Sequence, residues 1–187
     1  LAHLMKICII GGTGGMGKGF ALRWCINHDI LVGSRDAQRA SQSAQEYTKI
    51  AKESFGKING TISGNDNVSI SKQSDVLILS IPYENIDSTC SQILSEIKDD
   101  CVVISPIVPM TKTDLGFEFI PIKENKPFSY QLVAKYMKDK SKLVSAFHVI
   151  SEKKLVNPTL TLDYDIFVCW DDQNSVNVVN GLINEIK

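Results

Sequence analysis

Glycines are concentrated in one short stretch near the start of the chain, between an apolar run and a segment with helical spacing. Gly12, Gly14 and Gly17 follow the run at residues 6–10 and fit the spacing G-x-G-x-x-G. In such a unit the first glycine makes a tight turn, the second lets the backbone approach a pyrophosphate, and the third lets the helix pack on the strand. Phosphate oxygens would accept hydrogen bonds from the N–H groups at the start of the helix. The order of strand, glycines and helix predicts a dinucleotide site and favours it over a flexible turn.

The second apolar run, at residues 29–33, is followed by hydroxyl and cationic side chains rather than by a carboxylate. A strand end that prefers NAD carries Asp or Glu for the ribose 2′-hydroxyl. Here Ser34 and Arg35 follow, and Arg39 lies one turn later on the same helix face. A hydroxyl and two forked guanidinium groups suit the oxygens of a 2′-phosphate, so the sequence favours NADP over NAD. The alternative is that Arg35 is a solvated residue with Asp36 as its partner.

Three later apolar runs deliver distinctive residues to the same predicted edge of a sheet. The runs at residues 75–81 and 101–104 end in loops that contain proline, at Pro82 and at residues 105–109. Ligands of a doubly wound sheet bind outside the carboxyl ends of its strands, so these loops would flank the nicotinamide. Loops stiffened by proline and poor in polar groups would orient the two rings and exclude water, which suits hydride transfer. The alternative is that these are two ordinary loops without a role in binding. The run at residues 143–147 ends at His148, which is either structural or part of this edge.

Hydrophobic periodicity predicts the remaining elements. The alternation of strands and helices predicts an α/β fold, with a Rossmann-type, doubly wound, mostly parallel sheet in a single domain. We expect this domain to span residues 5–187 and residues 1–4 to be an expression remnant. Residues 110–127 are expected to be irregular and to form a lid or a dimer arm. The other expected elements are helices at 36–54, 66–73, 85–98 and 129–137, and strands within 59–64 and at 165–170. A last helix is expected to be capped by Asp171 or Asp172 and to run through Ile186.

Composition excludes several classes of function. The formal net charge of −1 gives no basic excess for nucleic acid, and the lysines at 135–142 are expected to be a solvated helix end. No apolar run is long enough to span a membrane. The five cysteines are far apart and form no metal-binding pattern, so we expect buried thiols, no metal site and a cytoplasmic protein.

With these residues in place, the chain resembles the NADPH-dependent reductases of the deazaflavin coenzyme F-420. The similarity covers nearly the whole chain. The glycine turn is common among Rossmann proteins, whereas the Gly-Ser-Arg strand end and the Ser-Pro-Ile-Val-Pro loop are more particular. The resemblance rests on the segments 11–14, 17–19, 32–35, 81–82, 105–109 and 145–148, together with Ile150.

The resemblance implies that a hydride passes reversibly between nicotinamide C4 and deazaflavin C5, in a cytoplasmic homodimer. No residue is expected to act as acid, base or nucleophile. Residues 13–16 would hold the pyrophosphate of NADP(H). The expected cofactor-binding residues are Gly12, Thr13, Gly14, Gly15, Met16, Gly17, Ser34, Arg35, Arg39, Ile81, Pro82, Asn85 and Val108. The residues expected near the nicotinamide and deazaflavin rings are Pro109, His148 and Ile150.

The sequence departs from the family pattern at two places. Ile150-Ser151-Glu152 stands where the family tends to have Ile-Pro-Ala, and this change is expected to alter contacts near the rings. The sequence stops at Lys187, whereas the family continues with further helical residues. A non-catalytic NADP-binding sensor or regulatory module is the main alternative function. A reductase of small imines or keto acids is another, but few residues remain for its usual helical domain.

Overall fold

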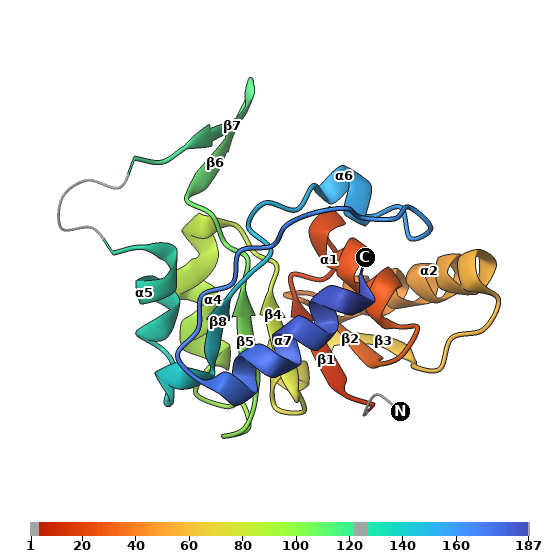
Figure 1. The fold of residues 1–187 in the computed structure, drawn as a ribbon, viewed down its shortest axis with the longest axis horizontal. Helices are drawn as coiled ribbons and strands as arrows, with labels where there is room; N and C mark the ends of the chain where they lie inside the picture. Colours follow the sequence, from red (N-terminus) through yellow and green to blue (C-terminus); the bar gives the residue numbers. More distant parts are fainter. Residues whose placement is uncertain (1–3, 122–126, 187) are drawn as a thin grey trace.

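Six parallel strands lie side by side through the middle of the molecule, in the order β3-β2-β1-β4-β5-β8 (Figure 1). The computed structural model describes residues 4–121 and 127–186. The chain starts at the centre of the sheet, builds one side through β3, and then returns to build the other side. This order confirms the predicted Rossmann-type α/β fold. The strands are β1 (Lys6–Ile10), β2 (Asp29–Ser34), β3 (Ile62–Asp66), β4 (Val76–Leu79), β5 (Val102–Ser105) and β8 (Leu143–Ser145).

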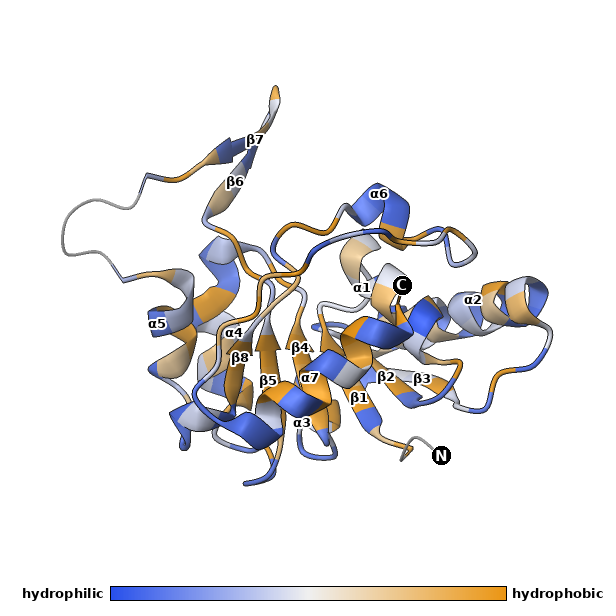
Figure 2. Cartoon of the chain, in the orientation of Figure 1, coloured by the Kyte–Doolittle hydropathy of each residue, from blue (hydrophilic) through white to orange (hydrophobic). Residues whose placement is uncertain are grey.

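Helices cover both faces of the sheet, and the strands are apolar on both sides (Figure 2). In β1, Ile7 and Ile9 face the core under α1, α2 and α7, while Cys8 and Ile10 face the core under α3, α4 and α5. Strands buried on both faces appear in sequence as continuous apolar runs. The helices are α1 (Gly15–Trp24), α2 (Ala37–Phe55), α3 (Asn67–Ser71), α4 (Ile86–Ile93), α5 (Ser129–Ala134), α6 (Glu152–Leu155) and α7 (Gln173–Glu185), with 3-10 turns η1 (Tyr83–Asn85) and η2 (Lys140–Lys142).

The last helix begins at a side-chain cap. The Asp172 carboxylate accepts hydrogen bonds from the Ser175 N–H at 2.8 Å and the Ser175 hydroxyl at 2.7 Å. These bonds lower the pKa of Asp172 to about 2. Asp172, rather than its neighbour Asp171, is therefore the residue that caps α7.

The strand predicted at residues 165–170 is wrong. Only Cys169 pairs with the sheet, through an isolated antiparallel bridge in which its N–H and C=O bond to Ser145 at 2.9 and 3.0 Å. Pairing does not extend because β8 ends at Ser145 and the backbone turns at Phe147, where φ is 68°. The segment instead runs across the edge of the sheet, with Ile166 and Val168 packed on the main core.

A hairpin, rather than an irregular segment, follows β5. Strands β6 (Met110–Thr113) and β7 (Gly116–Phe119) pair antiparallel and project from the body of the molecule (Figure 1). Gly116 closes the turn with φ 126°. The hairpin carries Leu115, Phe117 and Phe119, whose exposed fractions are 95%, 69% and 64%. The remainder of the predicted irregular stretch, at 122–126, lies outside the described residues.

Candidate functional site

The glycine turn links β1 to α1 at the carboxyl edge of the sheet. Gly11 has φ 73°, a conformation that favours glycine. The Gly12 N–H donates to the carbonyls of Ile9 at 3.1 Å and Gly33 at 2.8 Å, which ties the turn to β2. A Cβ added to Gly17 would lie 2.6 Å from the Gly12 Cα. Glycine at position 17 therefore allows α1 to pack directly on the turn.

The start of α1 faces the space above the sheet, with open space at Gly14 and the Glu152 side chain beside Gly15. Gly14 is the N-cap and provides no side-chain hydrogen bond, and the first turn of α1 contains no acidic residue. A Cβ added to Gly14 would meet only the Gly11 oxygen, at 3.5 Å. The helix dipole and N–H groups of Gly15 and Met16 suit an anion at this position. The turn therefore fits the pyrophosphate of a dinucleotide.

Helix α2 supports the glycine turn from the side. The buried Tyr47 hydroxyl donates to the Gly12 carbonyl at 3.1 Å, and Lys18 of α1 forms an ion pair with Glu46 of α2 at 2.7 Å. Burial raises the pKa of Tyr47, so the phenol remains a donor. The sequence placed Tyr47 on a buried helix face, but helical spacing carries no signal for its hydrogen bond.

The end of β2 presents the three residues expected to bind the 2′-phosphate. Ser34 is 8% exposed, and Arg35 and Arg39 are exposed. Asp36, the competing partner considered for Arg35, instead caps α2: its carboxylate accepts from the N–H groups of Gln38 and Arg39 at 2.9 and 3.2 Å. Within residues 4–121 and 127–186, neither arginine forms an ion pair. The two guanidinium groups are thus available to an anionic ligand.

The loops after β4 and β5 lie beside the glycine turn. A Cβ added to Gly11 would lie 3.1 Å from the Ile81 Cγ2 atom. Pro82 is exposed and precedes η1, which ends at the half-buried Asn85. Strand β6 contacts η1, so the half-buried Val108 and Pro109 lie on a loop that joins the same region.

The loop after β8 carries His148. The Ala146 N–H donates to the Ser105 carbonyl at 3.3 Å, so the loops after β5 and β8 leave the sheet side by side. His148 is half-buried, and this burial lowers its pKa, which favours the neutral imidazole. The Ile150 side chain is buried in the main core. The structure thus brings His148 to the expected edge but directs Ile150 into the protein interior.

An aromatic cluster fixes the backbone immediately before His148. Phe20 of α1 stacks on Trp24 at 4.7 Å between ring centroids, and Phe147 meets their ring edges at 5.1 and 5.9 Å. Phe147 is fully buried and is the non-glycine residue with positive φ in the described part of the chain. Strained backbone of this kind persists where packing over-determines it. Helix α1 therefore positions both the glycine turn and the His148 loop.

The same helix holds the segment that follows His148. Arg23 of α1 is only 5% exposed and donates to carbonyls of the 154–160 segment and of Ile186. A Cβ added to Gly19 would lie 2.5 Å from Leu155 Cγ, so α6 packs closely on α1. Glu152, at the start of α6, then lies against Gly15. The sequence predicted that Glu152 would alter contacts near the rings, whereas the structure places it against the glycine turn.

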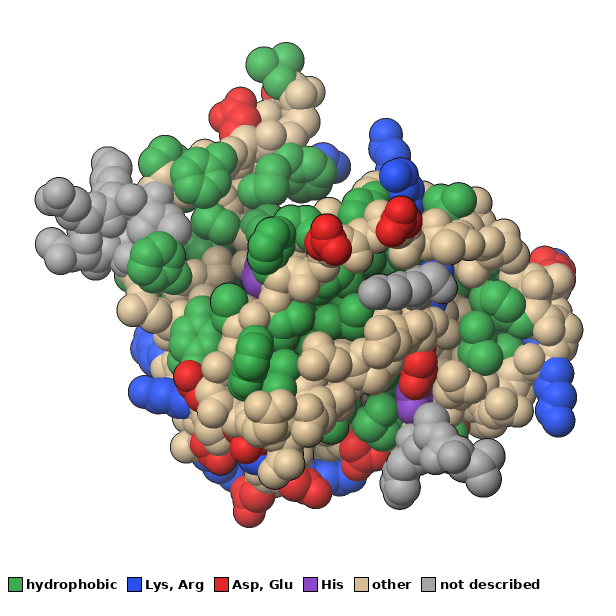
Figure 3. Space-filling model, viewed as in Figure 1, with side chains coloured by type: hydrophobic (Ala, Val, Ile, Leu, Met, Phe, Trp, Pro, Cys, Tyr) green, Lys and Arg blue, Asp and Glu red, His purple; other side chains and the backbone are tan. Residues whose placement is uncertain are grey.

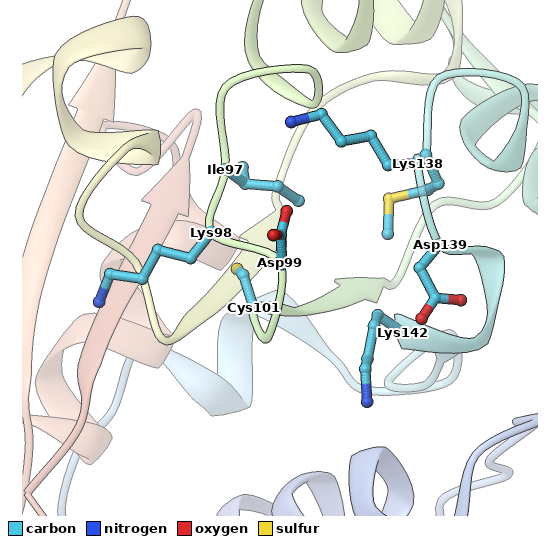
Figure 4. Close-up of a pocket in the computed structure, with 8 residues that line it drawn as sticks. Ile97, Lys98, Asp99, Cys101, Lys138, Asp139 and Lys142 are labelled. Atoms are coloured by element: carbon cyan, nitrogen blue, oxygen red, sulfur yellow. The ribbon is translucent and has the colours of Figure 1, made fainter.

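A cavity of about 200 Å³ lies at the opposite edge of the sheet (Figure 4). It adjoins Cys101, which directly precedes β5, and is therefore far from the carboxyl ends of the strands. Two of its lysines form ion pairs with carboxylates, Lys98 with Asp75 at 2.6 Å and Lys142 with Asp172 at 3.3 Å. This cavity is not part of the candidate site.

Other kinds of site find little support in the described residues. They contain no group of three or more residues arranged to hold a metal ion. Among the helices described, none combines the length and apolar character needed to cross a membrane. Four of the five cysteines are buried, as expected, while Cys169 is exposed.

Comparison with known proteins agrees with these observations. The model of the family described as "NADP oxidoreductase coenzyme F420-dependent" matches residues 6–109. A protein of Methanocaldococcus jannaschii named "F420-dependent NADP reductase" is 36% identical, over 97% of this chain and 80% of that protein. A protein of the same name from Methanothermobacter thermautotrophicus is 28% identical, over 98% of this chain and 78% of that protein.

Solved structures support the fold independently. A protein from Arthrobacter sp. superimposes with a TM-score of 0.74 at 14% identity, covering 97% of this chain and 80% of that one. A protein from Sinorhizobium meliloti gives 0.70 at 17% identity, with 99% and 82% covered. At these identities the similarity establishes the Rossmann-type architecture alone.

Proposed function

The chain belongs to the coenzyme F-420-dependent NADP oxidoreductase family, and on that premise we propose that it transfers a hydride reversibly between NADPH and coenzyme F-420. The observation that carries the proposal is the end of β2, where Ser34, Arg35 and Arg39 lie together and where, in the part of the chain that the structure describes, neither arginine forms an ion pair. A 2′-phosphate there would satisfy two exposed guanidinium groups. The nearby carboxylates of Asp36 and Asp66 are occupied as the caps of α2 and α3.

The glycine turn would bind the pyrophosphate of the same cofactor. The N–H groups of Gly15 and Met16 would donate to phosphate oxygens, and the open space at Gly14 would allow the close approach. Tyr47 keeps the turn in place through the Gly12 carbonyl. The cofactor would then extend across the sheet toward the loops after β4 and β5.

The ring end would be formed by the loops after β5 and β8. When bound, the nicotinamide supplies the hydride at C4 and the deazaflavin accepts it at C5. Val108 and Pro109 would form a stiff wall that orients the rings and excludes water. The neutral imidazole of His148 can donate or accept a hydrogen bond at a ring substituent without adding charge. None of these residues needs to act as a nucleophile.

A spectrophotometric assay tests the proposed activity. Purified protein is mixed with NADPH and oxidised coenzyme F-420, and the visible absorbance of the deazaflavin is followed, with NADH in a parallel reaction. We expect the absorbance to fall with NADPH and to fall much more slowly with NADH. NADPH binding with unchanged F-420 absorbance would refute hydride transfer to this acceptor and favour a non-catalytic binding module.

We also propose that the protein acts as a homodimer. The projecting hairpin supports this because it exposes Leu115, Phe117 and Phe119, and exposed apolar groups of this kind often mark contact surfaces. Light scattering measures the mass directly, and a mass of one chain at micromolar concentration would contradict the proposal.

A further inference from the structure

Glu152 places a carboxylate at the turn that would hold the pyrophosphate. A Cβ added to Gly15 would overlap Glu152 Oε1 and lie 2.5 Å from its Cδ atom. Gly15 is the first residue of α1, so the carboxylate lies at the N-terminal end of this helix, which is the positive end of the helix dipole. The acidic side chain thus occupies space next to the position expected for the cofactor's phosphates.

The backbone that carries Glu152 is firmly held. Arg23 bonds to the carbonyls of Leu155, Asn157 and Leu160 at 3.1, 2.7 and 2.8 Å, and Leu155 is buried against Gly19. The carboxylate of Glu152 is exposed, and within the described ranges it forms no ion pair. The side chain can therefore rotate outward, whereas its Cα remains near the turn.

We propose that Glu152 sets the affinity of the cofactor site, because its carboxylate competes with the pyrophosphate for the start of α1 and turns outward when the cofactor binds. This inference rests on the proposed binding of NADP(H). The carboxylate disfavours every ligand with a pyrophosphate at this turn, including NAD. Tight binding then depends on the 2′-phosphate contacts of Arg35 and Arg39, whereas Glu152 weakens NADP and NAD alike and leaves the preference between them unchanged.

The size of the effect follows from charge. Two unit charges about 4 Å apart in water interact by about one kcal/mol, which is roughly a fivefold change in affinity, and the pyrophosphate carries two charges. Because the carboxylate turns outward when the cofactor binds, the charges end farther apart than this, and removing the Glu152 charge is expected to tighten dinucleotide binding by at least about twofold and at most roughly thirtyfold. The effect is also expected to shrink at high ionic strength, because both charges are exposed to solvent.

Isothermal titration calorimetry of the full chain with three ligands tests the proposal. The ligands are NADP, NAD and adenosine 2′-monophosphate, which lacks the pyrophosphate. We expect Glu152→Gln to lower the Kd of NADP and NAD by the same factor and to leave the Kd of adenosine 2′-monophosphate unchanged. Glu53→Gln, which removes an exposed carboxylate from the far end of α2, is the matched control and is expected to change none of the three.

The results separate this inference from the proposed function. A change of less than twofold for NADP in Glu152→Gln, or an equal change for adenosine 2′-monophosphate, overturns the role of Glu152. If the binding differences appear but no hydride reaches coenzyme F-420, the reductase function fails and the role of Glu152 stands. If neither the wild type nor the variant binds NADP, both conclusions fail.

Discussion

Arg23 is the buried charge on which the arrangement of the site depends most directly. Its guanidinium donates to four carbonyls at 3.1 Å or less, those of Leu155, Ile186, Asn157 and Leu160. These carbonyls belong to the segment around α6 and to the end of α7. Replacing Arg23 with Met keeps a long side chain but leaves all four carbonyls without this donor.

The expected cost follows from the number of bonds and from burial. A single hydrogen bond to a charged group makes a net contribution of about 1.5 to 3 kcal/mol, but the contributions do not add fully, and the removed guanidinium no longer has to be desolvated. Burial lowers the pKa of Arg23, which is consistent with a desolvation cost for its guanidinium in the wild type. We expect Arg23→Met to lower the free energy of unfolding by about 3 to 5 kcal/mol. Arg23→Lys retains the charge but has fewer hydrogen-bond donors, so its free energy of unfolding should lie between those of the wild type and Arg23→Met.

Urea unfolding and limited proteolysis measure this prediction. A loss of this size corresponds to a melting temperature lower by roughly 6 to 20 °C for a chain of this length. Because α6 loses its anchor, proteolytic cleavage within residues 151–163 should also accelerate in Arg23→Met. Arg35→Met, an exposed change, is the control and should leave stability within about 0.5 kcal/mol. An Arg23→Met protein as stable as the wild type, with the same cleavage pattern, would refute the reasoning.

Three further outcomes are expected. In Tyr47→Phe the lost bond to the glycine turn should lower the free energy of unfolding by about 1 kcal/mol, and an unchanged urea midpoint would contradict the role of the hydroxyl. A thiol reagent at pH 8 should label the exposed Cys169 rapidly and the four buried cysteines only after denaturation. Burial raises the pKa of each of these four thiols, to about 11 for Cys25, so they stay protonated and unreactive in the folded protein. Rapid labelling of a second thiol in the folded protein would contradict this prediction. The pKa of Asp172 is lower in the folded protein than in the unfolded chain, where it is near 4, so the cap stabilises the fold above about pH 4 and this stabilisation is lost as the pH falls toward 2. The difference in free energy of unfolding between the wild type and Asp172→Ala should therefore disappear over that pH range, and a difference that persists at pH 2 would contradict the role of the cap.

Local patterns in the sequence were sufficient for the architecture. The parallel strands are buried on both faces, so residues such as those of β1 and β4 form unbroken apolar runs. Gly12 and Gly17 have backbone neighbours that exclude a side chain, and this requirement appears in the sequence as glycine spacing. The residue types at the end of β2 likewise predicted that Ser34, Arg35 and Arg39 lie at the carboxyl edge of the sheet. Their roles in cofactor binding stay predictions.

The remaining features depend on contacts between distant parts of the chain. Residues 165–170 have the apolar content of a strand, but a strand also needs an extended neighbour to pair with. The backbone after β8 is not extended, because Phe147 has a positive φ, and only the bridge between Ser145 and Cys169 forms. Glu152 meets Gly15 because Arg23 and Gly19, both more than a hundred residues earlier in the chain, hold α6 against α1. No periodicity or motif encodes such a contact.

The central claim is that the end of β2 recognises the 2′-phosphate of NADP, and paired titrations with NADP and NAD test it most directly. We expect the wild type to bind NADP at least roughly tenfold more tightly than NAD, a difference of about 1.4 kcal/mol. Arg35→Ala combined with Arg39→Ala should abolish that preference by weakening NADP alone, while Lys49→Ala on the same helix should preserve it. Equal affinity of the wild type for NADP and NAD, or a preference that survives loss of both arginines, would contradict the account.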